Sequence, residues 1–324
     1  MDIIRYNDDL EEKWDEFVDR SKNGTIFHTR KFLNYHPPDK FNDRSLIFSN
    51  KNNWAAVFPA AITEDNGRKI FKSHPGASYG GLVFQDKVSL QTVINVVDDL
   101  LNYARDQGMD YIEMRLPPRV FQIHPTEELD YVLSYKGFDV TAIELSSAAP
   151  LYIDLTKRFR GDTLRSVKKA GKAGVIIKES NDWDKYWPLL YKNLMERHKT
   201  TPTHTLEELN TLVSLLPNKI RLFAAYHDDK LIAGTAVFVC NKAACHTFYI
   251  AQNYEYQQFR PINLLFHNLM LQLKKEGFDY LNFGISTEAG GTIINPGLFR
   301  FKEGFGGCGV VRRYYRRRID RDEG

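Results

Sequence analysis

The sequence predicts a mixed α+β fold made of two tandem copies of one module, each a mostly antiparallel twisted sheet flanked by helices. Two matches at the same spacing indicate the duplication. Trp14-Asp15 is repeated as Trp183-Asp184, and the segment 108–113 (Gly-Met-Asp-Tyr-Ile-Glu) is repeated at 277–282 (Gly-Phe-Asp-Tyr-Leu-Asn), in each case 169 residues later. Self-similarity at a fixed spacing is the signature of a repeated structural unit.

The same succession of elements is expected in each copy. Both repeated segments open a strand and follow an amphipathic helix, predicted over 90–107 in the first copy and 261–276 in the second. Gly108 and Gly277 stand just past these helices and can adopt the left-handed conformation that ends a helix. The segment 227–230 (His-Asp-Asp-Lys) is a predicted hairpin turn. Further strands are expected near 45–49, 54–63, 69–73, 81–84, 220–227, 231–239 and 243–251.

The modules are predicted to span 1–150 and 151–324, with the boundary near the small residues 146–150, and the final strand at 310–324. The length of 324 residues, about twice that of a common domain, agrees with two modules. With 43% hydrophobic and 26% charged residues, the chain is neither disordered nor a coiled coil. Its longest apolar run, 54–62, has nine residues and contains a proline, whereas a membrane-spanning helix needs roughly 20.

The cellular compartment is expected to be the cytoplasm. The first residues show no basic segment followed by an apolar stretch, so no signal peptide is visible. The three cysteines, Cys240, Cys245 and Cys308, are too few and odd in number for a disulfide framework. A reduced protein is therefore expected.

The net charge of +3 hides an asymmetry between the halves. Residues 1–150 carry 17 basic against 23 acidic residues, a net of −6, and residues 151–324 carry 27 against 18, a net of +9. Such a split suggests that the second half meets an anionic ligand, although basic residues scattered by chance would give the same totals.

Two matches to catalytic motifs fail on their context. Residues 76–80 fit Gly-x-Ser-x-Gly, but the segment that follows is a predicted strand and not the helix of a nucleophile elbow. Residues 304–309 fit Gly-x-Gly-x-x-Gly, but again a strand follows, so a dinucleotide fingerprint is rejected. The histidines and cysteines have no ligand spacing, so no metal is expected.

Two segments of the second module are candidate anion-binding sites. One is a helix ending near Gly174, on which four basic residues at i, i+3, i+4 and i+7 share a face: Arg165, Lys168, Lys169 and Lys172. This face suits phosphates of a cofactor, a nucleotide-linked substrate or RNA, and is also what a solvated helix surface looks like. The other is the start of the helix at Pro261, where free N–H groups and Arg260 can hold a pyrophosphate or carboxylate, or serve only as a cap. Its candidate residues are Arg260, Pro261, Ile262 and Asn263.

The stretch 282–307 has the residues for acid–base chemistry. A strand leads into a Gly-rich loop with Glu288, followed by Asn295 and a short helix with Lys302. Glu288 can act as a base and Lys302 can stabilise a developing oxyanion, while a structural turn with a surface ion pair is the alternative. His246 and Tyr254 are further candidates to accept or relay the proton.

The stretch Phe-Gly-Ile-Ser-Thr-Glu followed by Asn-Pro-Gly-Leu and Phe-Lys-Glu-Gly-Phe-Gly-Gly (283–307) resembles the C-terminal signature of FemAB-like proteins in the GNAT acyltransferase superfamily. The segments 24–29, the basic helix ending in Lys-Ala-Gly-Val, and 254–256 leading to Pro261 are also similar. The resemblance implies two tandem GNAT-like modules, with acyl or aminoacyl transfer to an amine. It further implies a transition-state role for Lys302 and a final strand that returns to the first module. Asn295 is a candidate substrate-binding residue.

The sequence departs from the GNAT pattern in the segment that would bind the acyl donor. GNAT enzymes that bind coenzyme A carry Gln/Arg-x-x-Gly-x-Gly/Ala before the pyrophosphate-binding helix, and here 257–262 reads Gln-Gln-Phe-Arg-Pro-Ile, without glycine. Acyl-CoA remains the expected co-substrate, with no permanently bound cofactor. Aminoacyl-tRNA, the donor of the peptidoglycan-bridge branch, is the alternative.

The function predicted from these observations is N-acyl transfer by direct attack of an amine, without a covalent enzyme intermediate. The acceptor is expected to be a small-molecule or nucleotide-linked amine, with tRNA as a possible partner and no DNA. The alternatives are aminoacyl transfer from tRNA to a peptidoglycan precursor, and a non-catalytic protein that binds an anionic ligand or contacts a membrane surface through its Arg-rich tail. The residues do not indicate an oligomeric state.

Overall fold

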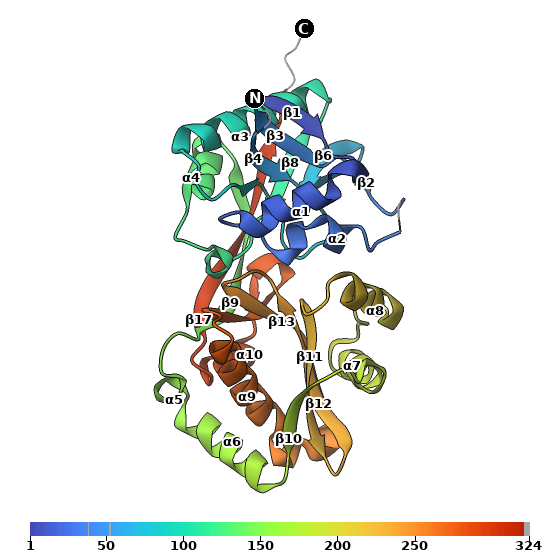
Figure 1. Cartoon of the computed structure of the whole chain (residues 1–324), viewed down its shortest axis with the longest axis vertical. Coiled ribbons are helices and arrows are strands. Elements are labelled where there is room, and N and C mark those ends of the chain that lie inside the picture. Colours follow the sequence, from blue (N-terminus) through green and yellow to red (C-terminus); the bar gives the residue numbers. More distant parts are fainter. Residues whose placement is uncertain (38, 52, 321–324) are drawn as a thin grey trace. The chain divides into compact units, whose positions relative to one another are not determined.

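A computed structural model describes residues 1–37, 39–51 and 53–320 (Figure 1). The chain divides into two compact units. The first contains Met1–Glu144, Ala289–Thr292 and the residues from Val311 onward, and the second contains Leu145–Glu288 and Ile293–Val310. None of the helices within the described ranges combines the length and apolarity that a membrane span requires.

The first unit has two sheets. One has the strand order β1-β3-β4-β7, made of Asp2–Arg5, Leu46–Asn50, Asn53–Phe58 and Val83–Phe84. In the other, the strands of this unit follow the order β17-β8-β6-β5-β2, made of Cys308–Arg318, Tyr111–Arg115, Arg68–Ser73, Ala60–Asp65 and Asn42–Asp43. Its helices are α1 (Glu11–Arg20), α2 (Arg30–Leu33), α3 (Leu90–Asp106) and α4 (Glu128–Tyr135).

The four-stranded sheet is packed on both faces, because successive apolar side chains of a strand point to opposite sides of it. On β3, Leu46 and Phe48 pack in a core with α3, whereas Ile47 packs with Trp14 of α1. A strand sends successive side chains to opposite faces, so a strand that is apolar throughout lies between two layers. The predicted helix at 90–107 is confirmed as α3.

The strand predicted over 54–63 is wrong as a single element. It forms two strands, β4 and β5, which belong to different sheets. The break falls at Pro59, which lacks an N–H to donate to a strand ladder. Its carbonyl accepts a bond from His74 N, at the end of β6.

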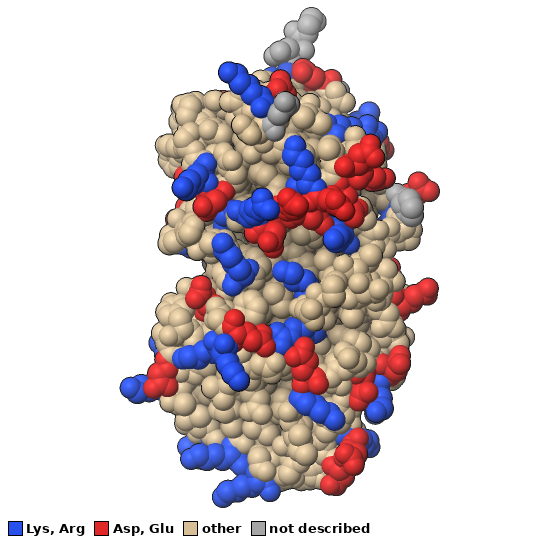
Figure 2. All heavy atoms as spheres, in the orientation of Figure 1, with Lys and Arg blue, Asp and Glu red and all other residues tan. Residues whose placement is uncertain are grey.

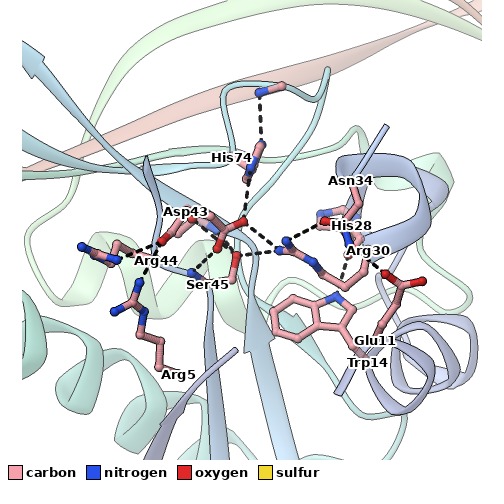
Figure 3. A network of polar contacts seen from close by, with 12 residues as sticks. Arg5, Glu11, Trp14, His28, Arg30, Asn34, Asp43, Arg44, Ser45 and His74 are labelled. Atoms are coloured by element: carbon pink, nitrogen blue, oxygen red, sulfur yellow. Dashed lines mark hydrogen bonds and ion pairs between the residues drawn. The ribbon is translucent and has the colours of Figure 1, made fainter. Parts of the chain in front are cut away.

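A buried polar network fixes the region between β2, α2 and β6 (Figure 3). Asp43 Oδ2 accepts from Arg30 Nη1 at 2.9 Å and lies 3.5 Å from His74 Nε2, while Asp43 Oδ1 accepts from Ser45 N at 2.8 Å. The Arg30 side chain is almost fully buried, and its guanidinium lies over the Tyr6 ring. Burial alone would raise the pKa of Asp43, but the hydrogen bond with His74 and the charge of Arg30 hold the pKa well below its usual value.

The second unit is built around the strands β10-β11-β12-β13-β14-β9, with only β13 and β14 parallel. Figure 1 shows α7 and α8 on one face of this sheet and α6 and α9 on the other. The strands are Ile176–Ser180 (β10), Ile220–His227 (β11), Lys230–Val239 (β12), Ala244–Gln252 (β13), Tyr280–Ile285 (β14) and Asp139–Pro150 (β9), of which the residues from Leu145 lie in this unit. The helices are α5 (Leu155–Arg158), α6 (Gly161–Lys172), α7 (Trp183–His198), α8 (Leu206–Leu215), α9 (Pro261–Lys275) and α10 (Pro296–Glu303), and β15 (Thr287–Glu288) pairs with β16 (Ile293–Ile294).

Local signals of the sequence explain several of these elements. The predicted turn at 227–230 is confirmed: His227 pairs with Lys230, and Asp228 and Asp229 both have positive φ, as a two-residue hairpin loop requires. Pro261 occupies the first turn of α9, and Gly174 has φ +79° just past α6. The small residues 146–150 are the end of strand β9, so the division between the units falls inside a continuous strand.

The two units repeat one succession of elements. A helix with the Trp-Asp pair, α1 or α7, comes first, followed by antiparallel strands, a long helix (α3 or α9) and a strand (β8 or β14). In each unit this last strand is parallel to a strand that precedes the long helix, β6 or β13. The fold class predicted from the sequence is confirmed.

Candidate functional site

The sheet of the second unit opens between β13 and β14. These two strands are paired from Ala244↔Tyr280 to His246↔Asn282 only. Beyond His246, β13 continues along β12 to Gln252, whereas β14 bends at Gly284, which has φ +77°. Loops and strand ends at such an opening are where backbone groups and side chains become available to a ligand.

His246 and Asn282 face each other at the last paired position, and both are buried. Asn282 Oδ1 accepts from Gly284 N at 2.8 Å and lies 3.0 Å from His246 Nδ1. Because the backbone N–H can only donate, the Asn282 atom between them is the oxygen, and His246 Nδ1 must carry a hydrogen. The neutral imidazole then has its lone pair on Nε2. The other side of the carboxamide, Asn282 Nδ2, donates to Ser146 Oγ on β9 at 3.1 Å.

Lys302 lies on α10 and is 2% exposed. Its ammonium donates to three acceptors at the end of β14 and just after it: Gly284 O at 2.8 Å, Ile285 O at 2.6 Å and Ser286 Oγ at 2.8 Å. Burial lowers the pKa of Lys302 from 10.5 to about 7. A lysine with such a pKa changes its charge near neutral pH, which is common at functional sites.

Gly284 joins the two groups. Its N–H donates to the oxygen that faces His246, and its carbonyl accepts from Lys302. Hydrogen bonds to Asn282 on one side and to Lys302 on the other therefore fix the backbone of Gly284. The structure brings together two of the four predicted catalytic residues, His246 and Lys302, in this network.

The other predicted residues of this region have different surroundings. Glu288 is exposed on the two-residue strand β15. Tyr254, half-buried in the 3₁₀ helix Tyr254–Phe259, lies under the guanidinium of Arg197, 4.3 Å from its ring centre. Asn295 caps α10, since its side chain accepts from Leu298 N, and its own N–H donates to Ser286 O. Asn295 thus supports the segment that Lys302 holds.

Arg260 has a backbone conformation usually left to glycine. It is the N-cap of α9, with φ 58° and ψ 43°, and its carbonyl accepts from Asn263 N. It stands where the coenzyme-A pattern has its first glycine, and it adopts a left-handed conformation that glycine adopts readily. Pro261 is buried, whereas Arg260 is exposed and Ile262 and Asn263 are half-buried.

The strain at Arg260 leads to a test. Left-handed backbone costs a non-glycine residue roughly 1–2 kcal/mol, and glycine avoids this cost but loses more freedom on folding. We expect Arg260→Gly to be about 1 kcal/mol more stable than Arg260→Ala, measured by urea unfolding. The alanine variant is the matched control because both changes remove the charge. Equal stabilities would show that the turn carries no strain.

The basic residues predicted on one face are exposed together on α6. Arg165, Lys168 and Lys169 project from this helix with Lys172, while Val167 and Ala170 are buried on its other side. None of the four forms an ion pair with a carboxylate in the part of the chain that the structure describes. Figure 2 shows blue side chains over α6 at the lower left, and red ones gathered over α1 in the first unit.

Comparison with known proteins identifies the part of the chain that contains this site. Residues 157–303 match the model of the acetyltransferase (GNAT) domain, which includes β13, β14 and Lys302. FemX, at 13% identity, superposes with a TM-score of 0.73 over 97% of both chains. The chain has a FemAB-like tandem GNAT fold.

Two further structures superpose on nearly the whole chain. L-PGS from Bacillus licheniformis is 11% identical, with a TM-score of 0.62 over 96% of this chain and 93% of that one. A tandem GNAT protein from the clavulanic acid biosynthesis pathway is 10% identical, with a TM-score of 0.53 over 99% of both chains. No curated protein sequence matches the chain.

Sequence reasoning missed several residues of the candidate site. Asn282, Ser146 and Ser286 supply its buried hydrogen bonds, but Ser146 and Asn282 are 136 residues apart. One signal was available for Asn282. Asparagine is depleted in strands, and this one ends the repeated segment 277–282, inside a predicted strand.

Proposed function

We propose that the chain is an acyltransferase that moves an acyl group from acyl-CoA to an amine by direct attack. The observation that carries the proposal is the network in which His246 and Lys302 are joined through Asn282 and Gly284, at the opening between β13 and β14. The GNAT match over 157–303 supports acyl transfer as the class of reaction.

His246 takes the proton in this proposal. The neutral amine attacks the thioester carbonyl carbon, a carbon–nitrogen bond forms and the carbon–sulfur bond breaks. The proton that the nitrogen loses goes to His246 Nε2. The thiolate of CoA leaves and takes this proton from His246, so that CoA departs as the thiol and the imidazole is neutral again. Asn282 holds the ring with Nδ1 protonated, so that Nε2 is the basic atom.

Lys302 stabilises the oxyanion of the tetrahedral intermediate. Its three N–H groups are directed at Gly284, Ile285 and Ser286, and only the last of these acceptors is a side-chain hydroxyl. The oxyanion replaces Ser286 Oγ as the third acceptor, while the two carbonyl bonds keep the ammonium in position. A donor fixed before the reaction avoids the cost of reorganisation.

The pyrophosphate of the donor binds at the start of α9. Backbone N–H groups of a helix N-terminus favour an anion, and the exposed Arg260 adds a full charge. Ile262 and Asn263 belong to the first turn of this 15-residue helix. These features can hold the donor without the loop glycines.

Ligand-induced stabilisation tests the donor. We expect acetyl-CoA and free CoA to raise the thermal midpoint, because a ligand at 100 times its Kd stabilises the native state by about 2.7 kcal/mol. The Arg260→Gly variant keeps the turn and is expected to bind CoA more weakly. A midpoint unchanged by either ligand would contradict the choice of acyl-CoA.

A second donor is favoured by the exposed cations of α6. Arg165, Lys168, Lys169 and Lys172 have no carboxylate partner among the described residues and would suit the phosphates of an aminoacyl-tRNA. The same titration with a charged tRNA pool distinguishes the two donors. Salt-sensitive tRNA binding that weakens when the four residues are changed to glutamine, together with no response to CoA, would favour aminoacyl transfer.

A further inference from the structure

A second opening lies in the first unit, at the position that corresponds to the candidate site. Strands β6 and β8 are parallel from Ile70↔Tyr111 to Lys72↔Glu113 only, just as β13 and β14 part after His246↔Asn282. A cavity of about 240 Å³ begins where β6 and β8 end. It is lined by residues of β6, β8 and β17 and the segment after β6, among them Lys72, Ser73, Tyr79, Glu113, Arg115 and Tyr314.

The two openings contain different chemistry at matched positions. The spacing of 169 residues relates Glu113 to Asn282, and the strand register relates Lys72 to His246. The neutral contact between His246 and Asn282 is thus replaced by an ion pair, Lys72 Nζ to Glu113 Oε2 at 3.2 Å. Lys72 has its charge committed to Glu113 and is not placed to act as a base. The first unit thus has an ion pair at its opening, where the second unit has a contact between two polar side chains.

Among the charged side chains around this cavity, one cation is not paired with a carboxylate of the described residues. Glu113 faces two cations, since Arg316 Nε lies 3.5 Å from its Oε1, and Glu144 beyond it is paired with Arg312. Arg115 lines the cavity, and its guanidinium has no carboxylate within ion-pair distance among the described residues. It lies instead 4.9 Å from the centre of the Tyr314 ring. A half-buried guanidinium without a counter-ion strongly favours an anion nearby.

The backbone holds this residue firmly. Arg115 N donates to Ser73 Oγ at 3.1 Å, its carbonyl accepts from Gly80 N at 2.8 Å, and β8 pairs with β17 through Arg115↔Tyr314. The Tyr314 hydroxyl donates to Glu144, which fixes the ring against which the guanidinium lies. The aromatic side chain of Tyr79 is part of the same wall. With its backbone held and its guanidinium against an aromatic ring, Arg115 can bind two oxygens of one planar or tetrahedral anion.

We propose that this cavity binds the carboxylate or phosphate group of a small ligand, with Arg115 as its partner and Tyr314 and Tyr79 against the stem of the ligand. The site is a second binding site and does not depend on the proposed acyl transfer, because it requires no reaction. Carboxylate and phosphate share the recognition by two oxygens, and the two probes below distinguish them.

Calorimetric titration with sodium benzoate and with inorganic phosphate, at constant ionic strength, tests the site. We expect one of them to bind to the full chain, and Arg115→Met to weaken that binding about tenfold or more, as loss of a charge-assisted hydrogen bond predicts. Benzoate as the ligand would identify a carboxylate site with an apolar stem, and phosphate would identify a phosphoryl site. Arg20→Met is the matched control, because Arg20 is an exposed arginine of the same unit on α1.

Arg115→Gln, which keeps a polar side chain of similar reach, replaces the methionine variant if the latter does not fold. The proposal is overturned if neither probe binds to the native chain. It is also overturned if the folded Arg115 variant binds as tightly as the native chain, or if Arg20→Met weakens binding as much as the Arg115 change does.

Discussion

Lys302→Met is expected to lower kcat for acyl transfer by about 100-fold or more and to change KM much less. Removal of one oxyanion donor from an enzyme typically costs 10²–10³ in kcat, because the interaction strengthens as the charge develops. The change is measured by steady-state kinetics with the acyl donor that stabilises the chain. Methionine fills a similar volume, so the surroundings of the buried Lys302 stay packed.

Two variants separate catalysis from structure in this experiment. Ser286→Ala removes only the hydroxyl acceptor that the oxyanion is proposed to replace, and is expected to keep most of kcat. Lys275→Met, at the exposed end of α9, is expected to change nothing. Unchanged kcat in the Lys302 variant would exclude the lysine from the reaction. A rise in KM alone would mean that Lys302 only shapes the binding site.

Asp43→Asn is expected to reduce the free energy of unfolding by about 3 kcal/mol, since removing one partner of a buried ion pair leaves the other charge uncompensated. The buried Arg30 would lose the only carboxylate with which it is paired in the described part of the chain. Asparagine keeps one oxygen for Ser45 N, so the change tests the charge more than the hydrogen bond. Asp19→Asn, on the exposed face of α1, is the matched control and is expected to be neutral.

The pH dependence of this effect has a definite sign. The pKa of Asp43 is held below its value in the unfolded chain, so its contribution to stability is present above the unfolded pKa of about 3.9 and is lost as the pH falls further. Urea unfolding between pH 3 and pH 7 is expected to show the native chain and Asp43→Asn differing most near neutral pH and converging in acid. A difference that stays constant with pH would argue against the ion pair as its cause.

Much of the fold follows from local signals in the sequence. Alternating or helical hydrophobic patterns located α3, α9 and β11, Pro261 located the start of α9, and the Asp-Asp pair located the hairpin. Pro59 was also visible, but the apolar pattern on both sides of it hid the break between β4 and β5. Whether two successive strands share a sheet depends on pairing with distant residues, which hydrophobic periodicity does not record.

The candidate site was predictable only in part, for the same reason. Lys302 and His246 were named from motif and strand position, but the contact that relates them passes through Asn282 and the backbone of Gly284. The side chain of Asn295 was predicted to contact substrate, but its oxygen caps α10. Residue type and spacing identify groups that can react, whereas their partners are set by tertiary contacts.

Strand β17 has a consequence for how the protein is made. Residues 314–318 pair with β8, whereas the other first-unit strands of that sheet, β8, β6, β5 and β2, lie between residues 42 and 115. During synthesis, β8 therefore presents an unpaired edge while roughly 200 further residues are added. The first unit is finished only after residue 318 has left the ribosome, so this unit completes its folding later than the position of its first strands suggests. An exposed strand edge during that delay is where a chaperone would be most useful.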